Sequence, residues 1–271
     1  MMQRVLCNAN TSLILLLYPI IRIVLKKEFE MRRSSIKSLV ITAAAAILFS
    51  GCGDSDNGTD SPAISPDELP QEVKDTLAYM GNEERLAHDV YLNLYNFHKD
   101  VNGIDIPQLY NIATNSETKH ISIVQSLVQA YNITVSDLSN VDENVINENG
   151  MSPTNMPSGV YDVPRIQELY DMLYAKGVNS QQDALEVGCM VEVTDIDDLN
   201  KYIQEAQALG VSDIQTSFET LREGSYSHYW AFDAGLKSMG IADGCCSLGT
   251  IDGVNYCHPE YPQNSGKQRG R

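Results

Sequence analysis

A glutamate and a histidine three residues apart give this sequence its clearest sign of chemistry. Glu117-Thr-Lys-His120 lies within a segment that is predicted to be a long amphipathic helix. At this spacing a carboxylate and an imidazole project from the same face of a helix. Facing helices can complete such a pair into a metal site, rich in oxygen and nitrogen ligands, in the core of a bundle. The motif therefore predicts a metal site that needs partners from other helices.

Other predicted helices offer such partners. Glu84 interrupts an otherwise apolar helix face, where an unpaired carboxylate would be costly. Glu192 and Asp195 lie three residues apart on a later helix, and His228 lies on the core face of the last one. Glu83, one residue before Glu84, is predicted to point elsewhere and to be solvated. The predicted site thus draws on four helices.

Helix signals dominate from Leu69 to about Gly240, where strand signals are almost absent. Apolar residues at three–four spacing predict helices over residues 70–98, 107–131 and 164–176, a further helix that begins at residue 180, and a last one over residues 212–239. Ser180 and Ser212 are predicted to cap the last two, and Asp195-Ile-Asp-Asp198 to bend or restart the fourth. Residues 132–163 form a connection that is too long for a tight turn. An all-α fold follows, with a long connection between its second and third long helices, as in some four-helix bundles.

Charge is unevenly distributed along the chain. The net charge is −17, yet residues 1–50 carry seven Lys and Arg against two Glu. The remaining 221 residues hold 12 basic and 34 acidic side chains. A surface this acidic repels phosphate backbones, so the composition argues against nucleic-acid binding.

The N-terminal region predicts export and lipid anchoring. Residues 31–52 have the pattern of a lipoprotein signal peptide, with Arg32 and Arg33 before an apolar run and Phe49-Ser50-Gly51-Cys52 similar to a lipobox. Cys52 would then carry the lipid and attach the protein to a membrane, on its periplasmic or cell-surface face. An uncleaved signal anchor is the alternative. Residues 53–66 predict a flexible linker. Residues 1–30 fit no export signal, and we interpret them as a spurious upstream extension, with translation starting at Met31.

The cysteines and remaining histidines are less informative. Residues 241–271 are predicted to be an irregular tail that holds Cys245, Cys246 and Cys257. An oxidising compartment permits a disulfide there, and Cys246–Cys257 is one of several pairings. A zinc loop with His258 is the alternative. Cys189 is predicted to be a small buried residue, and His98 and His258 to lie on the surface.

Residues 67–240 resemble the bacterial ferritin-like proteins that are catalogued as domain of unknown function 2202. The resemblance is carried by four blocks in order: Asn82-Glu-Glu-Arg-Leu-Ala-His-Asp-Val-Tyr91, Ile112-Ala-Thr-Asn-Ser-Glu-Thr-Lys-His120, Asp183-Ala-Leu-Glu-Val-Gly188 with Glu192-Val-Thr-Asp-Ile-Asp-Asp-Leu199, and Gly224-Ser-Tyr-Ser-His-Tyr-Trp-Ala-Phe232. The family is similar to rubrerythrins and ferritins, whose bundles bind two irons. The resemblance implies a ferritin-like up-down four-helix bundle with iron, or manganese, as one or two ions. The implied ligands are Glu84, Glu117, His120, Glu192 and His228, with Asp195 as a further ligand.

The sequence departs from the family pattern on the last helix. Ser225 stands where the pattern has a glutamate, three residues before His228. Glu223 lies off that helix face and is a poor substitute. Asp195, His88 or water could take the place of the missing glutamate as a ligand. Without such a replacement, the site would hold one metal. Tyr91, two turns beyond Glu84, could donate a hydrogen bond to a ligand, or be an ordinary core tyrosine.

Three classes of function remain open from the sequence. The first is a redox enzyme acting on peroxide or ferrous iron, which would need an external electron donor because no rubredoxin-type Cys-x-x-Cys pair is present. The second is metal sequestration without turnover. The third is a lipid-anchored interaction module with a vestigial metal site. Whether the protein is an enzyme, and whether it forms a homodimer, the sequence leaves open.

Overall fold

A computed structural model describes residues 69–134, 137–142 and 157–263. The predicted signal peptide, Cys52 and the linker lie outside the described residues. The helices are α2 (Gln71–Asn102), α3 (Pro107–Ile112), the π-helix η2 (Ala113–Glu117), α4 (Thr118–Ala130), α6 (Pro164–Gly177), α7 (Gln181–Leu209) and α8 (Ser212–Ser238). The predicted all-α fold is confirmed, because the only strands in the described part are the two-residue β1 (Thr250–Ile251) and β2 (Val254–Asn255).

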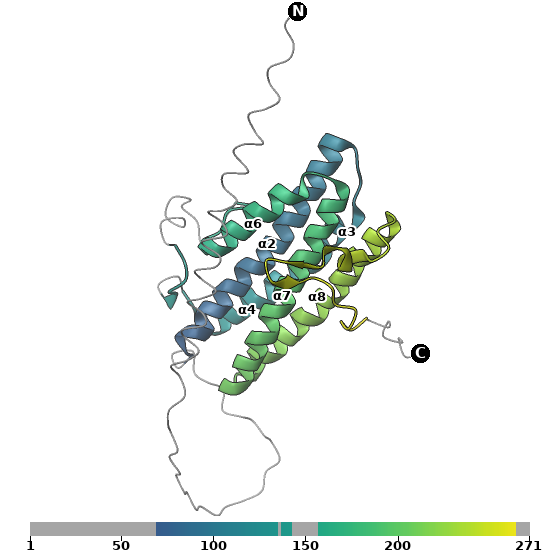
Figure 1. Cartoon of the computed structure of the whole chain (residues 1–271). Helices are drawn as coiled ribbons and strands as arrows, with labels where there is room; N and C mark the ends of the chain where they lie inside the picture. The colour runs from purple at the N-terminus through teal and green to yellow at the C-terminus, as the bar shows by residue number, and fades with distance from the viewer. Residues whose placement is uncertain (1–68, 135–136, 143–156, 264–271) are drawn as a thin grey trace, which may run out of the picture. The chain divides into compact units, whose positions relative to one another are not determined.

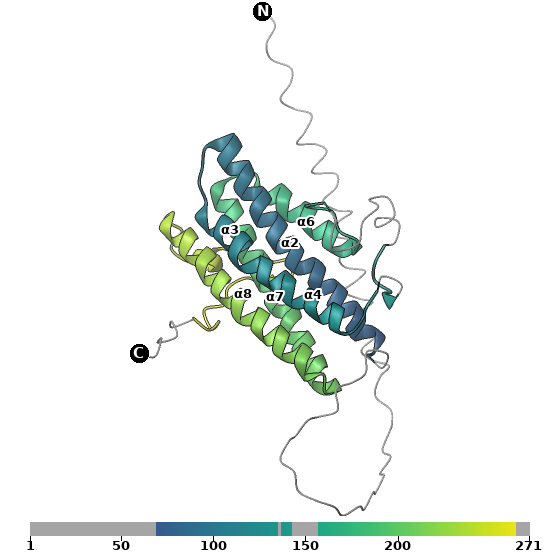
Figure 2. The ribbon, with the colours of Figure 1, turned by 180° about the vertical axis from the view of Figure 1, so that it is seen from behind.

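Four long helical rods run side by side (Figures 1 and 2). They are α2, the continuous rod of α3, η2 and α4, then α7, and α8. Helix α7 packs along α8, α2 packs on α4, and α6 lies against α2 and α7. The long connection between α4 and α7 carries α6. None of the helices in the described residues is long and apolar enough to cross a membrane.

Glycines and one serine set the ends of the long helices. Gly103 and Gly210 end α2 and α7 with φ of 66° and 72°, a left-handed conformation that glycine adopts without steric cost. Ser180 caps α7 as predicted, since its Oγ accepts a hydrogen bond from the Asp183 N–H at 3.0 Å. The predicted cap at Ser212 is wrong, because Val211 holds the N-cap position of α8 without a side-chain bond.

Two further helix predictions are corrected. Helix α2 continues past His98 to Asn102. Helix α7 runs without a break through residues 195–198, because Ile196 and Leu199 are fully buried and hold this stretch in the core. Local acidic residues therefore did not interrupt the helix, and tertiary packing decided its length.

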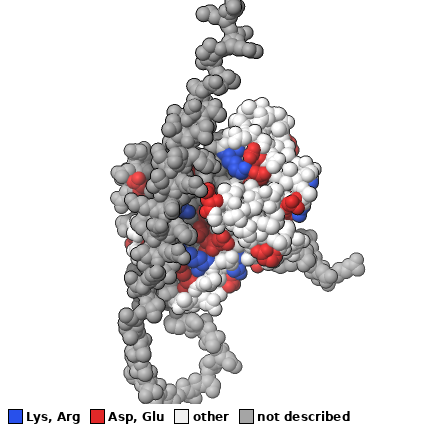
Figure 3. Space-filling model, viewed as in Figure 1, with Lys and Arg blue, Asp and Glu red and all other residues white. Residues whose placement is uncertain are grey.

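Apolar residues form two clusters along the bundle. One contains Leu86, Ile106 and Phe232 among its members, and the other contains Leu77, Val124 and Phe218. Buried polar side chains separate the two clusters on α2 (Glu84), on the rod of α3, η2 and α4 (Glu117 and His120) and on α8 (Ser225 and His228). On α7, Glu192 and Asp195 lie beside Val193 and Ile196, which belong to the first cluster. A polar layer is thus enclosed between two apolar ones. At the surface, the face seen in Figure 3 shows acidic side chains in small groups, some beside basic ones.

The tail is more regular than the sequence predicted. Residues 244–248 form the short helix η5, and β1 pairs with β2 in an antiparallel hairpin. Disulfides join Cys246 to Cys257, the pairing chosen from the sequence, and Cys189 to Cys245. Cys189 is therefore not a lone buried thiol, and no sulfur of the tail is left for the alternative zinc loop. The second disulfide fastens the tail to α7.

His98 was also predicted wrongly. It is fully buried, and its Nε2 lies 2.8 Å from the carbonyl oxygen of Gly177. Gly177 itself packs so closely on α2 that a Cβ there would lie 2.4 Å from Leu94. His98 thus ties α6 to α2. His258 is half-buried beside Glu260.

The two disulfides should contribute unequally to stability. Cys189 and Cys245 are 56 residues apart, against 11 for Cys246 and Cys257. Because a longer loop loses more entropy in the unfolded chain, we expect Cys189→Ala/Cys245→Ala to cost about 4 kcal/mol and Cys246→Ala/Cys257→Ala about 3 kcal/mol. Urea denaturation of both variants beside the parent protein measures this. A larger loss of stability in Cys246→Ala/Cys257→Ala than in Cys189→Ala/Cys245→Ala would contradict this expectation.

Candidate metal centre

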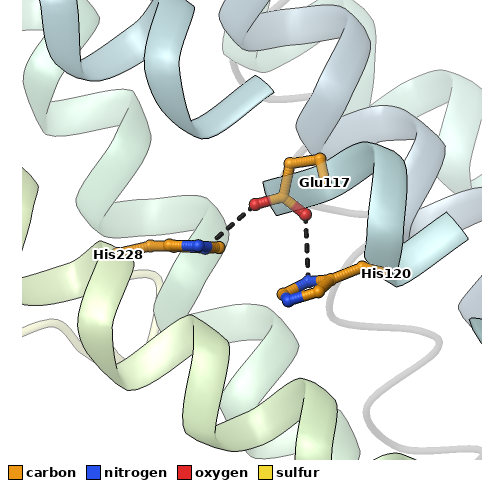
Figure 4. Close-up of side chains that lie close together, drawn as sticks. All are labelled: Glu117, His120 and His228. Carbon is orange, nitrogen blue, oxygen red and sulfur yellow. Dashed lines mark ion pairs between the residues drawn. The ribbon is translucent and has the colours of Figure 1, made fainter. Parts of the chain in front are cut away.

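Glu117 lies between two histidines in the polar layer (Figure 4). Its Oε1 is 2.9 Å from His228 Nδ1, and its Oε2 is 3.2 Å from His120 Nδ1. All three side chains are buried, and one ligand atom from each lies within 4.8 Å of the others. The two imidazole rings stack with centroids 5.3 Å apart. This group could hold a metal ion.

The π-helix positions the centre. Glu117 is the last residue of η2, and α4 begins at the next residue, so Glu117 and His120 keep one face in common. A π-turn holds one residue more than an α-turn and is frequent at functional sites. Ser116, at the end of the same turn, places its Oγ 2.7 Å from His228 Nε2. If Nε2 donates its proton to Ser116, Nδ1 is the nitrogen that faces Glu117 and would be free to bind a metal once deprotonated.

Two more carboxylates complete the surroundings of the histidines. Glu84 Oε2 lies 3.1 Å from His120 Nδ1, and Glu192 Oε2 lies 3.4 Å from His228 Nδ1. The Tyr91 hydroxyl donates a hydrogen bond to Glu192 Oε1 at 2.6 Å. The structure therefore brings together all five side chains that the sequence singled out first, with Tyr91 as a support.

Asp195, Ser225 and His88 have different surroundings. The Ser225 hydroxyl donates to Asp195 Oδ2 at 2.5 Å, across the interface of α7 and α8. Asp195 lies within the electrostatic reach of Glu84, Glu192 and His120, so it belongs to the same polar layer. His88 instead places its Nδ1 2.9 Å from Asp89 Oδ1 and is half-buried.

Several ligand atoms in this layer have no hydrogen-bond partner among the described residues. They include Glu117 Oε1, His228 Nδ1, Glu84 Oε1 and Asp195 Oδ1. Glu117 Oε1 and His228 Nδ1 lie 2.9 Å apart as an ion pair. Two ligands at right angles about 2.1 Å from one ion are about 3 Å apart. The unpaired atoms and their separation therefore fit a bound cation.

Charge coupling governs the pKa values of the centre. Burial alone would lower the histidine pKa values, but Glu84 and Glu117 outweigh it for His120, and Glu192 and Glu117 for His228. The pKa of His120 rises to about 12 and that of His228 to about 10. Burial would raise the pKa of Glu117, but the two histidines hold it well below its ordinary value. Burial raises the pKa of Glu84 to about 7. Without a metal, both imidazoles are therefore protonated at neutral pH.

Close helix packing holds His120 in place. A Cβ at Gly224 of α8 would lie 2.4 Å from His120 Nε2, so only glycine lets the imidazole pack against this helix. A Cβ at Gly188 of α7 would likewise lie 2.4 Å from the ring of Phe232. Neither glycine could be assigned a role from the sequence, because a glycine inside a helix indicates close packing only when the neighbouring helix is known.

The fold and the site together place this chain among all-α bundle proteins with a candidate metal centre, formed here by a buried cluster of carboxylates and imidazoles. The chain belongs to the family described as "Uncharacterized protein domain (DUF2202)", which matches residues 73–249. It is 35% identical over 173 residues to the uncharacterized protein MJ0754 of Methanocaldococcus jannaschii, covering 64% of this chain and 79% of that protein. The crystal structure of hypothetical protein MJ0754 matches with a TM-score of 0.52, over 64% of this chain and 83% of that chain.

Replacement of Gly224 tests the packing of His120. Gly224→Ala should cost about 1–3 kcal/mol, because the new methyl group must displace an imidazole held by two carboxylates. Gly81→Ala is the matched control within α2, since its Cβ would meet Val124 at an ordinary 3.4 Å. The control should be neutral or gain up to about 1 kcal/mol from helix propensity. Urea denaturation of the metal-free variants measures both, and equal stability of the two would contradict the contact.

Proposed function

We propose that this protein is a ferritin-like metalloprotein that binds iron, or a similar divalent metal, at Glu117, His120 and His228. Glu84 and Glu192 would complete the ligand set. The observation that carries the proposal is the buried Glu117 carboxylate, one oxygen facing each imidazole, with ligand atoms that lack hydrogen-bond partners among the described residues. Burying these groups without a cation would leave polar atoms unsatisfied, which is costly.

The chemistry of the donors favours iron or manganese. The cluster offers carboxylate oxygens and imidazole nitrogens, a set that suits these metals. All four cysteines of the described residues are in disulfides, so none is available there as a thiolate ligand. One or two ions can be considered, because the carboxylates outnumber the histidines.

The residues around the centre would prepare it for the metal. Ser116 orients His228, and Tyr91 holds Glu192, so that their ligand atoms face the cluster before binding. The flanking apolar clusters exclude water and strengthen each electrostatic contact. When bound, iron would supply one-electron redox chemistry toward peroxide or dioxygen. Turnover would require an external electron donor, and metal sequestration is the alternative use of the same centre.

We further propose that the domain works outside the cytoplasm, anchored through a lipid on Cys52. Two disulfides in the described residues support this placement, because such bonds persist in oxidising compartments. The lipobox-like sequence supports the anchor. Labelling with a radioactive fatty acid, and its loss in Cys52→Ala, tests the lipid directly.

Metal content is the first test of the proposed function. Protein purified without chelators, or loaded with ferrous iron under anaerobic conditions, should contain at least about one ion per chain by elemental mass spectrometry. Glu117→Ala/His120→Ala should lose it, because two of the three central ligands are removed. Glu260→Ala/His258→Ala is the matched control, a second Glu–His contact at 2.7 Å that lies in the tail. No metal in the parent protein after loading would reject the proposal.

Metal affinity should fall as the pH is lowered. In the metal-free protein the pKa values of about 12 for His120 and about 10 for His228 keep both imidazoles protonated near pH 7. Binding must remove a proton from each, so about two protons should be released per site, and affinity should drop up to about 100-fold per pH unit. Calorimetry in buffers of different ionisation enthalpy measures the release. Binding without proton release would contradict the assigned ligands.

A further inference from the structure

A cavity of about 280 Å³ lies between α2, α4 and the connection that follows α4. Its apolar walls are formed by Leu77, Ala78, Val124, Val128, Ile133 and Leu138. None of the residues assigned to the metal centre lines it. Its size falls just below the range of about 300–1,000 Å³ that holds drug-sized ligands. The cavity therefore fits a small molecule with a hydrocarbon part, at a place separate from the metal centre.

A buried carboxylate lines the same cavity. Asp162 is fully buried just before α6, and neither of its carboxylate oxygens has a hydrogen-bond partner among the described residues. Burial raises the pKa of Asp162, although Asn82 and Arg85 favour its charged form. A buried acidic group without a donor is costly to keep. Asp162 thus offers two acceptor atoms that the fold itself does not use.

Asn82 supplies a third acceptor. Its Nδ2 donates a hydrogen bond to the carbonyl oxygen of Ala78 at 2.9 Å, one turn earlier on α2. This bond identifies the other amide atom, Oδ1, as the acceptor that remains. Oδ1 is buried, and it has no partner among the residues that the structure describes. Because Asn82 also lines the cavity and acts on Asp162, three unpaired acceptors accompany the apolar walls.

A primary ammonium group matches these acceptors. It carries three N–H donors, no acceptor and one positive charge, so it can satisfy three oxygens and balance one carboxylate. A hydroxyl group has a single donor and would leave the carboxylate charge uncompensated. A hard metal ion takes about six to eight oxygen ligands, which the apolar walls do not supply. The net charge of −17 also favours the approach of a cationic ligand.

We propose that this cavity binds a small organic amine, with its ammonium group at Asp162 and Asn82 and its hydrocarbon part between α2 and α4. The site stands apart from the proposed metal centre and does not depend on it. Asp162 would pair with the ammonium charge, and the Asn82 amide would accept the remaining N–H bond. The apolar walls would select amines that carry a hydrocarbon chain over the ammonium ion itself.

Hexylammonium chloride is a suitable probe, because it joins three N–H donors to an apolar chain. Calorimetric titration of the purified protein near pH 7 should show saturable binding of one amine per chain. 1-Hexanol, which has the same chain, should bind at least about 10-fold more weakly, since it lacks the charge-assisted hydrogen bonds. Asp162→Asn should weaken hexylammonium binding by at least about 10-fold. Asp100→Asn is the matched control, an exposed aspartate on α2 with the same change in charge, and should bind like the parent.

A second variant separates loss of the site from loss of the fold. Ala78→Leu fills part of the cavity and keeps every polar group, so it should also lose hexylammonium binding. Without amine, Asp162→Asn should melt no lower than the parent, because it removes a buried charge that lacks a hydrogen-bond donor. A lower melting temperature would show that the carboxylate serves the fold, and would overturn the inference.

The remaining outcomes are equally distinct. No saturable binding by the parent, equal affinity for 1-hexanol, or unchanged affinity in Asp162→Asn would each overturn the amine site. Metal-free and metal-loaded protein should bind hexylammonium equally. A failure of the amine site would leave the proposed metal centre unaffected, because the two sites share no ligand residue.

Discussion

The burial of several carboxylates in one layer of a helical bundle is the constraint on which the rest of this structure depends. Each acidic group must meet a proton, an imidazolium or a cation, since its charge is otherwise too costly in the interior. Two histidines lie among the acidic groups and lack the number to balance them. The remaining carboxylates must therefore hold protons or meet a cation, and apolar clusters flank the layer.

The helices could be predicted from the sequence because their signals are local. Apolar spacing located the long helices, and Ser180 marks the start of α7. The length of α7 beyond Asp195 could not be predicted in this way, because it depends on burial of Leu199 against other helices. The Cys189–Cys245 disulfide was missed for the same reason, since a pairing over this separation is decided by the fold.

The candidate site could be predicted in part. Glu84 was identified because a charge stands in an apolar stripe, and Glu117 and His120 because their spacing shares a face. The burial of Glu83 was not predicted, because the pattern of α2 alone places this residue on the solvent face. In the packed bundle, residues on both faces of α2 are buried at this point. The contact of Ser116 with His228 could not be predicted from the sequence either, because it depends on a π-turn, and no residue type indicates such a turn.

That π-turn has a consequence for the comparison of relatives. It inserts one residue into the rod between Pro107 and Ala130 without breaking it. A relative with an uninterrupted α-helix would reach the same geometry at the histidines with one residue fewer. An alignment of the two sequences without a gap could pair the Glu-x-x-His motifs correctly, but the apolar residues before the motif would then be out of register by one position. If it paired those apolar residues correctly, the motifs would be out of register instead. The correct alignment would therefore need a gap of one residue inside a helix, a position where alignments usually penalise gaps.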